Sequence, residues 1–175
     1  IKCLQKMQLN KLEHKIISFD DLSRLKEEFK LENKQSVFTN GCFDLIHLGH
    51  IDYLMKARQL GNVLIVGVNT DDSVRRLEKG VSRPIKDENQ RLMILAAFQF
   101  VDFVMLFDDD TPLRLIKELE PSILVKGGDY SVTQKDPDQQ DYIVGSNEMI
   151  MLGNRVEVIP FVSGYSTSIL EQKII

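Results

Sequence analysis

Short apolar runs alternate along the chain with longer segments in which apolar residues recur at helical spacing. The short runs are typical of buried strands in a parallel sheet, because both of their faces are apolar. Strands are predicted at 36–39, 62–69, 102–107, 122–127 and 155–161. Helices are predicted at 17–30, from 51 to Gly61, and at 71–78, 88–98, 108–120 and 166–174. The polar segment 129–148 has weak periodicity and is predicted to be a loop over the functional site.

The alternation of strands and helices predicts an α/β fold with a Rossmann-like, doubly wound parallel sheet. Strand–helix–strand units of this kind have right-handed crossovers, and they bury the sheet between two helical layers. Ligands of such sheets bind outside the carboxyl ends of the strands. Three polar or glycine-rich loops follow predicted strands there: 39–44, 69–73 and 126–130.

The composition indicates one globular domain and disfavours several classes of protein. A chain of 175 residues with 43% hydrophobic content can bury one substantial core. We expect an N-terminal extension at 1–15 and one domain at 16–175. The net charge of −4 disfavours a broad nucleic-acid-binding face. Two cysteines give no disulfide framework, and no apolar run reaches the roughly 20 residues of a membrane span, so a cytoplasmic protein is expected.

The stretch FTNGCFDLIHLGH has the most specific pattern in the chain. His47 and His50 lie three positions apart at a predicted helix start, so their side chains project from one face. Gly49 removes a side chain where a ligand would approach, and Asn40-Gly41 allows a tight turn beneath a phosphate. Two imidazoles so placed can donate hydrogen bonds to a phosphoryl group that gains charge in a transition state.

Three other interpretations of this stretch are open. Asn-Gly is also the strongest two-residue hairpin signal, although helical rather than alternating sequence follows it here. Two histidines at a helix start can be purely structural. Cys42, His47 and His50 could also bind zinc, although no fourth ligand stands at the usual spacing.

Basic residues gather in the segment 75–91, where an anionic ligand would need them. Six of the chain's 22 basic residues lie there: Arg75, Arg76, Lys79, Arg83, Lys86 and Arg91. Such a segment could clamp substrate phosphates. Lys79 and Arg91 are the better candidates, whereas a solvated surface is the simpler interpretation of Arg75, Arg76 and Lys86.

Two further loops complete the candidate site. At one, a strand end is followed by two glycines that permit close contact with a flat ligand or a phosphate, although a simple turn explains them as well. The candidates there are Lys126, Gly127 and Asp129. At the other, a predicted helix start that favours anions has more hydroxyls than one capping box needs. The candidates there are Ser166, Thr167 and Ser168.

Together these motifs resemble the HxGH nucleotidyltransferases of the cytidylyltransferase-like superfamily. The resemblance covers about 16–174 and rests on TNGCFDLIHLGH, GVNTDDSVRRL, RPI, NQR, LVKGGDY and GYSTS. FTNGCFD and VKGGDY are most similar to the D-glycero-β-D-manno-heptose 1-phosphate adenylyltransferases, which act in lipopolysaccharide precursor synthesis as separate proteins or as half of a kinase–adenylyltransferase fusion. The resemblance implies an HxGH nucleotidyltransferase domain at 16–175 that transfers AMP from ATP to the sugar phosphate, with Mg²⁺ present, and releases pyrophosphate.

The resemblance also implies roles for individual residues. The catalytic residues would be His47, His50 and Lys79. The nucleotide would be bound by Thr39, Asn40, Gly41, Cys42, Phe43, Asp44, Gly49, Arg91, Lys126, Gly127, Asp129, Ser166, Thr167 and Ser168. No side chain is assigned to the metal. Only small-molecule substrates are expected, and the family suggests a homodimer or a higher homo-oligomer.

One position departs from related cytidylyltransferases, which have an arginine early in an R-T-x-G-I-S-T pattern. Phe161 stands at that place in PFVSGYSTS, which disfavours a glycerol 3-phosphate cytidylyltransferase and agrees with ATP as the donor. The rival interpretations are CTP with an alditol phosphate, ATP with pantetheine phosphate, and a nucleotide-binding module without turnover. Class I aminoacyl-tRNA synthetases share the HxGH element, but this chain has no KMSKS sequence.

Overall fold

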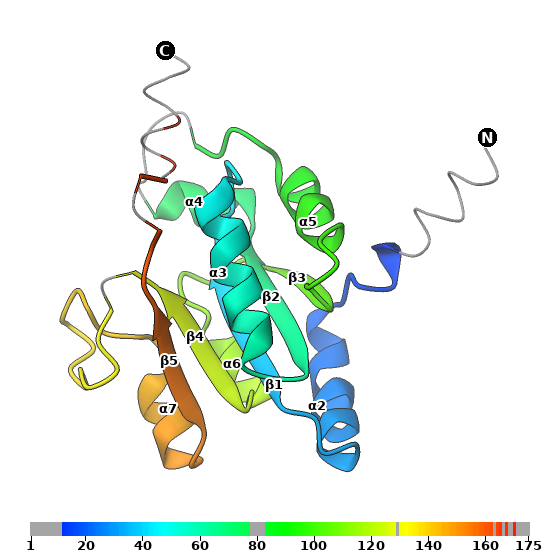
Figure 1. Ribbon diagram of the computed structural model, residues 1–175, viewed down its shortest axis with the longest axis vertical. Coiled ribbons are helices and arrows are strands. Elements are labelled where there is room, and N and C mark those ends of the chain that lie inside the picture. The colour runs from blue at the N-terminus through cyan, green and yellow to red at the C-terminus, as the bar shows by residue number, and fades with distance from the viewer. Residues whose placement is uncertain are drawn as a thin grey trace.

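A five-stranded parallel sheet forms the centre of the structure (Figure 1). The computed structural model describes residues 12–77, 83–128, 130–162, 164, 165, 167 and 170. The strands lie in the order β3-β2-β1-β4-β5, and all neighbouring pairs run parallel. They are β1 (Ser36–Gly41), β2 (Val63–Asn69), β3 (Phe103–Phe107), β4 (Ile123–Gly127) and β5 (Arg155–Ile159). The predicted α/β fold with a doubly wound parallel sheet is confirmed.

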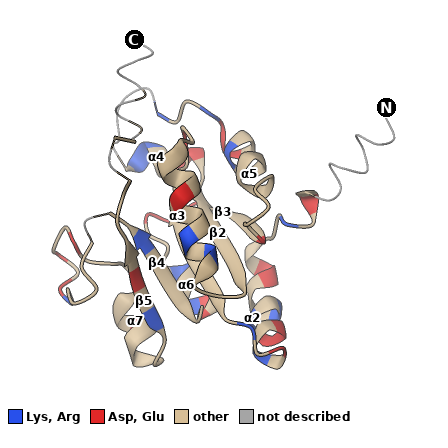
Figure 2. Ribbon diagram, viewed as in Figure 1, with Lys and Arg blue, Asp and Glu red and all other residues tan. Residues whose placement is uncertain are grey.

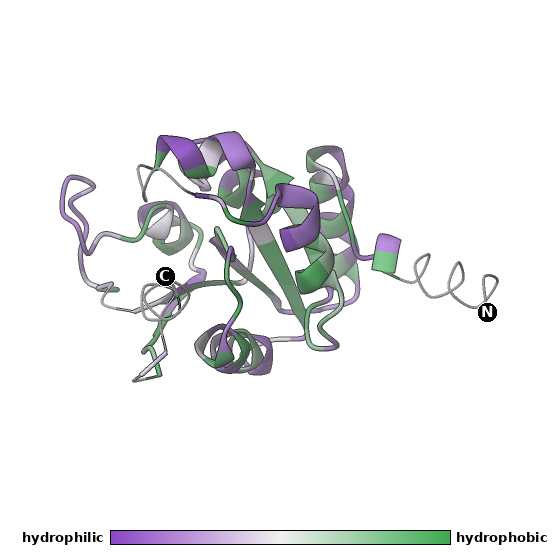
Figure 3. Cartoon of the chain, turned by 90° about the horizontal axis from the view of Figure 1, so that it is seen from above, coloured by the Kyte–Doolittle hydropathy of each residue, from purple (hydrophilic) through white to green (hydrophobic). Residues whose placement is uncertain are grey.

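Helices cover both faces of the sheet. One face packs against α3 (Leu48–Gln59) and α5 (Glu88–Ala96). The other packs against η1 (Phe19–Asp21), α2 (Leu22–Leu31), α6 (Leu113–Leu119) and α7 (Ser146–Met151), while the short α4 (Asp71–Arg76) follows β2. Seen from above, hydrophobic strands lie between helices whose outer surfaces are hydrophilic (Figure 3).

Alternate strand residues supply the two cores. In β2, Leu64, Val66 and Val68 pack on the α3 and α5 side, whereas Val63 and Ile65 pack on the α2 and α6 side. Successive side chains of a strand point to opposite faces, so a strand buried on both sides must be apolar throughout. This explains why the strands appear in the sequence as unbroken apolar runs.

The sheet opens between β1 and β4 at their carboxyl ends. β1 pairs with β2 from Ser36 to Gly41, but its pairing with β4 is limited to Val37 and Phe38. The strand order also reverses at this point, because the chain builds outward from β1 to β3 and then returns to β4. Such a switch point leaves a crevice in which α/β proteins bind ligands. Below, the crevice is the region between the carboxyl ends of β1 and β4, and the loops described next lie around it.

Most predicted elements are present, with differences at the helices. The helix predicted at 108–120 begins at Leu113, after Pro112, and the helix predicted at 166–174 lies almost wholly outside the described residues. Helix α7 was not predicted, because six residues give little periodicity; burial of Met149 and Ser146 shows that tertiary packing stabilises it. The preceding segment 130–142 forms turns that extend beside β5 and not over the start of α3 (Figures 1 and 3).

The segment before residue 16 already contacts the core. Lys15 Nζ donates to the carbonyls of Phe98, at 2.9 Å, and Val101, at 2.7 Å, and Leu12 packs against the α3 side of the core. The N-terminal extension predicted at 1–15 is therefore packed at its end, and residues 1–11 lie outside the described residues. Within the described part of the chain, no helix has the length and apolar content needed to cross a membrane.

Candidate functional site

The site begins where β1 ends and the chain turns into α3. Gly41 closes the strand, and Phe43 adopts a left-handed conformation with φ of 52°. The Phe43 ring folds back over Gly41, where an added Cβ would lie 3.2 Å from it. The parallel pairing of β1 with β2 rules out the alternative of an Asn-Gly hairpin. The turn instead points the start of α3 toward the crevice, where free helix N–H groups favour an anion.

The rings of His47 and His50 lie against each other at the start of α3, tilted by 37°. His47 is the N-cap residue, and the two ring centroids are 3.9 Å apart. The backbone N–H of His47 donates to Nδ1 of His50 at 3.4 Å. Because an accepting ring nitrogen has no proton, this contact assigns the proton of neutral His50 to Nε2. His50 therefore presents Nε2 as a donor.

Gly49 makes room for the His47 ring. A Cβ at Gly49 would lie 3.0 Å from two atoms of that ring and 3.4 Å from Cβ of Tyr165. Nδ1 of His47 is buried and has no hydrogen-bond partner among the residues that the structure describes. Buried polar atoms without partners are uncommon and are typical of functional positions. The glycine is thus needed for ring placement as well as for ligand access.

Both histidines are neutral near pH 7. Burial lowers the pKa of His47 below its ordinary value. Burial also lowers the pKa of His50, with a smaller contribution from His47, to about 4. Removing an imidazolium from water is unfavourable, so a half-buried ring without a carboxylate partner stays uncharged. The pair can donate hydrogen bonds without adding a formal charge.

Asp44 connects the turn after β1 to the segment 83–87 before α5, which is called the basic loop below. Its buried carboxylate accepts the backbone N–H groups of Ile85, at 2.9 and 3.0 Å, and of Lys86, at 2.8 Å. Arg83 Nη1 lies 3.7 Å from the same carboxylate, and Lys86 Nζ donates to the Asp44 carbonyl at 3.2 Å. Asp44 therefore has the geometry of a residue that holds the loop.

Arg91 is fully buried and joins three loops. Nη1 donates to the carbonyls of Cys42 and Asn69, both at 2.7 Å, and Nε donates to the carbonyl of Lys86 at 3.1 Å. Nη2 forms a 2.7 Å ion pair with Asp71. These bonds use most of the guanidinium donors. The structure thus places Arg91 beneath the site as a support, and its predicted contact with the nucleotide stays a prediction.

Two predicted binding residues on β1 have different surroundings. Asn40 faces the crevice, where its Oδ1 accepts from Lys126 Nζ at 2.7 Å across the gap between β1 and β4. Thr39 is buried, and its hydroxyl lies 2.6 Å from the hydroxyl of Tyr53, which donates to the Val125 carbonyl at 3.2 Å. The side chain of Thr39 therefore positions α3 on the sheet and does not face the crevice.

The basic segment divides into exposed and loop-holding residues. Arg75 pairs with Asp72, and Arg76 pairs with Asp108 and Asp110 on the surface. This agrees with the solvated interpretation of both arginines. In Figure 2 the ribbon is blue, for Lys and Arg, on α4 and along the described segment that leads into α5. Lys86 differs from the expectation, because its backbone and side chain both contact Asp44.

Several predicted site residues lie outside the described part of the chain. These are Lys79, Asp129, Ser166 and Ser168. Thr167 is described as helical and half-buried, and Tyr165 brings its segment next to Gly49. The start of the last predicted helix is therefore near the histidines, while the contacts of its hydroxyls stay predictions.

Sequence reasoning missed several residues that build the site. Tyr53, Asp71 and the Asn69 carbonyl were not assigned, although they hold Thr39 or Arg91 in place. One sequence signal was available: Arg91 occupies the buried face of α5 together with Leu92 and Leu95. A charged residue within an apolar helical stripe indicates a buried polar network.

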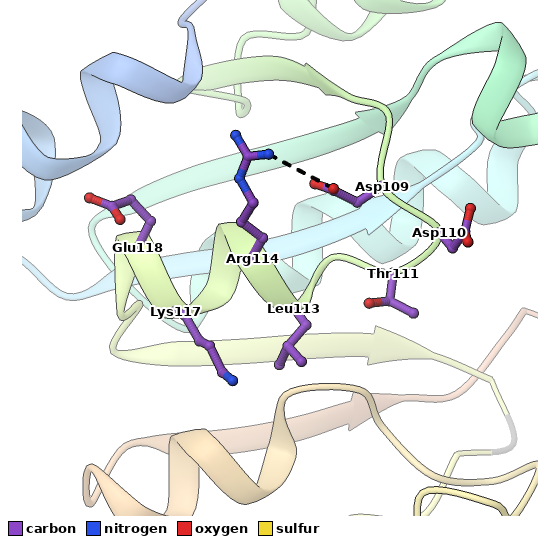
Figure 4. Close-up of a pocket in the computed structure, with 7 residues that line it drawn as sticks. All are labelled: Asp109, Asp110, Thr111, Leu113, Arg114, Lys117 and Glu118. Atoms are coloured by element: carbon purple, nitrogen blue, oxygen red, sulfur yellow. Dashed lines mark ion pairs between the residues drawn. The ribbon is translucent and has the colours of Figure 1, made fainter.

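The described residues contain no group of three or more His, Cys, Asp or Glu side chains that could hold a metal ion. Cys42 Sγ lies 3.9 Å from Asn69 Oδ1. A cavity of about 450 Å³ lies elsewhere, at the start of α6, on the opposite face of the sheet from α3 (Figure 4). Its lining includes Asp109, Arg114 and Lys117. Because it is remote from the histidines, we assign the site to the crevice and not to this cavity.

The fold and the site together define a Rossmann-like nucleotide-binding α/β protein with an HxGH motif at a helix start. The family model described as cytidylyltransferase-like matches residues 38–173, a range that includes both histidines and extends past β5. The chain therefore belongs to the cytidylyltransferase-like family.

Two curated relatives are similar over most of this chain. Bifunctional protein HldE of Campylobacter jejuni strain RM1221 is 53% identical over 164 residues, which cover 91% of this chain and 33% of that protein. Bifunctional protein HldE of Geotalea uraniireducens strain Rf4 is 50% identical over 160 residues, which cover 91% and 31%. The chain thus spans about a third of the length of these relatives.

Two solved structures share the fold. The lipopolysaccharide core biosynthesis protein from Thermoplasma volcanium GSS1 has a TM-score of 0.57 and 30% identity, and the match covers 76% of this chain and 99% of that one. Pantoate-β-alanine ligase from Francisella tularensis has a TM-score of 0.58 and 14% identity, covering 89% and 75%. The second likeness concerns the fold alone.

The support role of Arg91 predicts a large effect of a conservative substitution. Arg91→Lys should lower the free energy of unfolding by about 2–4 kcal/mol, because one ammonium group cannot reach three carbonyls and Asp71 together. Urea unfolding measures the change. The matched control is Arg75→Lys, which alters an exposed ion pair and should stay within about 0.5 kcal/mol of wild type. An Arg91→Lys protein as stable as the control would contradict this role.

The low pKa of His50 predicts a loss of stability in acid. The unfolded histidine, with a pKa near 6.5, takes up a proton before the folded one, with a pKa of about 4, so stability falls as the pH drops through this window. At pH 5 the loss attributable to His50 is about 1–2 kcal/mol. Urea unfolding at pH 7 and pH 5 should show a smaller loss for His50→Gln than for wild type.

The surface residue His14 supplies the control for this measurement, because it is exposed. His14→Gln should keep the wild-type difference between the two pH values. An equal difference in His50→Gln and wild type would show that His50 is not buried in its neutral form.

Proposed function

We propose that this domain transfers the adenylyl group of ATP to D-glycero-β-D-manno-heptose 1-phosphate, forming ADP-heptose and pyrophosphate for lipopolysaccharide precursor synthesis. The observation that carries the proposal is the pair of neutral imidazoles at the start of α3, beside the open crevice. The sugar substrate is supported by the sequence resemblance. It is also supported by the names of the relatives, HldE and a lipopolysaccharide core biosynthesis protein.

The proposed reaction needs hydrogen-bond donors to the phosphate oxygens more than it needs a general base. An oxygen of the sugar phosphate attacks the α-phosphorus of ATP, the bond from that phosphorus to the bridging oxygen breaks, and pyrophosphate leaves with the bonding electrons. The attacking phosphate is already ionised, so no proton has to be removed from it. Catalysis by the protein then consists of positioning and of stabilising the charge on the equatorial oxygens.

The histidine geometry matches this requirement. His50 has its Nδ1 occupied by the His47 backbone, so its Nε2–H is the group left to donate. Because its pKa is about 4, the ring stays a neutral donor across the physiological range. Preorganised donors of this kind contribute most when they are aimed at the charge that develops during reaction. His47, whose ring lies against that of His50, can donate a hydrogen bond from the same end of α3.

The loops would bind the phosphates around these donors. The backbone of the turn Gly41–Phe43 approaches the crevice, and Asn40 and Lys126 bridge its two walls. We assign nucleotide binding to these groups and to Gly49, which lies beside the His47 ring. The predicted contacts of Lys79, Asp129, Ser166, Thr167 and Ser168 would complete the enclosure.

We propose that Mg²⁺ binds together with the nucleotide, through its phosphates, and not at a site formed by protein side chains alone. The described residues form no carboxylate cluster for it, and the Asp44 carboxylate is occupied by backbone amides. Mg²⁺ keeps several waters and commonly binds through substrate phosphates. It would supply charge neutralisation on the phosphates of the nucleotide.

Kinetics of two histidine variants test this function. His47→Ala and His50→Ala should each lower kcat by roughly 10²–10³, the usual effect of removing one preorganised donor. The assay measures pyrophosphate release from ATP and heptose 1-phosphate. His14→Ala is the matched control, because His14 is exposed, and it should retain wild-type kcat.

Three results would overturn the proposal. Unchanged kcat in both variants would exclude the donor mechanism. Turnover of wild type with CTP and an alditol phosphate, or with ATP and pantetheine phosphate, in preference to ATP and heptose 1-phosphate would assign the same mechanism to other substrates. ATP binding without pyrophosphate release from any acceptor would indicate a binding module.

A further inference from the structure

Phe161 is exposed and yet closely seated on the backbone. It follows β5, and 68% of its surface is accessible to solvent. Large apolar side chains in such positions are usually free to move, because little contacts them. Phe161 instead lies directly on the glycine pair at the end of β4, Gly127 and Gly128.

The position of the Phe161 ring requires glycine at both 127 and 128. A Cβ at Gly128 would lie 2.3 Å from the Phe161 ring, and one at Gly127 would lie 3.0 Å from it. Gly128 also has φ of 102°, which disfavours any other residue. The ring therefore occupies the space that side chains at these two positions would need, while 68% of the Phe161 surface is exposed to solvent. The arrangement is a platform and not part of a core.

The platform and the histidines belong to one wall of the crevice. A Cβ at Gly127 would lie 3.0 Å from the Phe161 ring and 3.1 Å from the Tyr53 ring of α3, so both rings lie over the same side of this glycine. Four residues after Phe161, Tyr165 lies against Gly49, beside the His47 ring. Phe161 thus lies at the end of β4, and Tyr165 lies at the start of α3. A ligand with phosphates at the histidines can extend along this wall to Phe161.

We propose that Phe161 is the surface on which the adenine base of the nucleotide stacks. This inference rests on the proposed use of ATP and adds the residue that binds its base. A supported aromatic ring with one open face suits a planar π-system, and base–aromatic stacking strengthens binding by about 5- to 100-fold per base. A purine covers more of the ring than a pyrimidine, which makes Phe161 a contributor to donor choice as well.

The neighbouring groups favour a base over a charged group at this position. Lys126 Nζ is engaged by Asn40 Oδ1 and lies 5.8 Å from the centre of the Tyr130 ring. Tyr130 is itself 39% exposed. Aromatic surface therefore gathers at the β4 and β5 ends, whereas the hydrogen-bond donors gather at the start of α3. A nucleotide has the same division between base and phosphates.

Binding measurements with two probes test the platform. The dissociation constants of ATP and of inorganic tripolyphosphate, which has no base, are measured by calorimetry for wild type and variants. Phe161→Ala should weaken ATP binding about 5- to 100-fold and leave tripolyphosphate binding unchanged. Phe161→Leu should lose most of the same affinity, and Phe161→Trp should keep it. Met151→Ala, at a still more exposed apolar site on α7 before β5, should leave both constants unchanged.

Several binding results would contradict stacking on Phe161. Equal weakening of ATP and tripolyphosphate in Phe161→Ala would mean that the ring supports the phosphate loops. Unchanged ATP affinity, or wild-type binding of ATP no tighter than that of tripolyphosphate, would exclude stacking. A loss confined to heptose 1-phosphate would assign the ring to the sugar. Failure of wild type to release pyrophosphate would remove the proposed reaction, while ATP affinity that depends on Phe161 would still support stacking.

Discussion

The buried guanidinium of Arg91 is the interaction on which the site depends. Its bonds reach the turn after β1 at Cys42, the end of β2 at Asn69 and Asp71, and the basic loop at Lys86. A charged group without solvent has to be satisfied by the protein, so these loops are stable together in one arrangement. Asp44 adds the second connection by binding the amides of the basic loop. Loops at the ends of separate strands thereby form one rigid base under the histidines.

The same rigidity explains the chemistry. A neutral imidazole is a weak donor in water, but it is effective when its ring cannot reorient and its proton is confined to one nitrogen. Three features at the start of α3 provide these conditions. They are the close contact of the two rings, the hydrogen bond from the His47 N–H to His50, and the space that Gly49 leaves for the His47 ring. Burial keeps both pKa values low, which suits transfer to a phosphate that is already ionised. The proposed reaction type rests on this geometry and on the family, whereas the proposed sugar rests on the resemblance and on the relatives.

The sequence predicted the sheet well, because strands buried on both faces leave unbroken apolar runs such as 62–69. It predicted the location of the site from the HxGH spacing and the Asn-Gly turn. It did not predict α7, which is too short for periodicity and depends on the burial of Met149. It did not show that Tyr53 bonds Thr39 or that three loop carbonyls bond Arg91, because residue type alone does not identify such partners; the predicted nucleotide contacts of both residues stay predictions. Partners distant in sequence decide such roles.

The central claim is that His47 and His50 are neutral, converging donors held at one phosphate position. Nitrogen-15 NMR of histidine-labelled protein measures the proton position and ionisation of each ring directly. The account predicts that His50 at pH 7 is neutral with its proton on Nε2, and that α,β-methylene ATP shifts the Nε2 signals of both histidines. A His50 ring that titrates near pH 6.5, or signals that do not respond to the analogue, would contradict it.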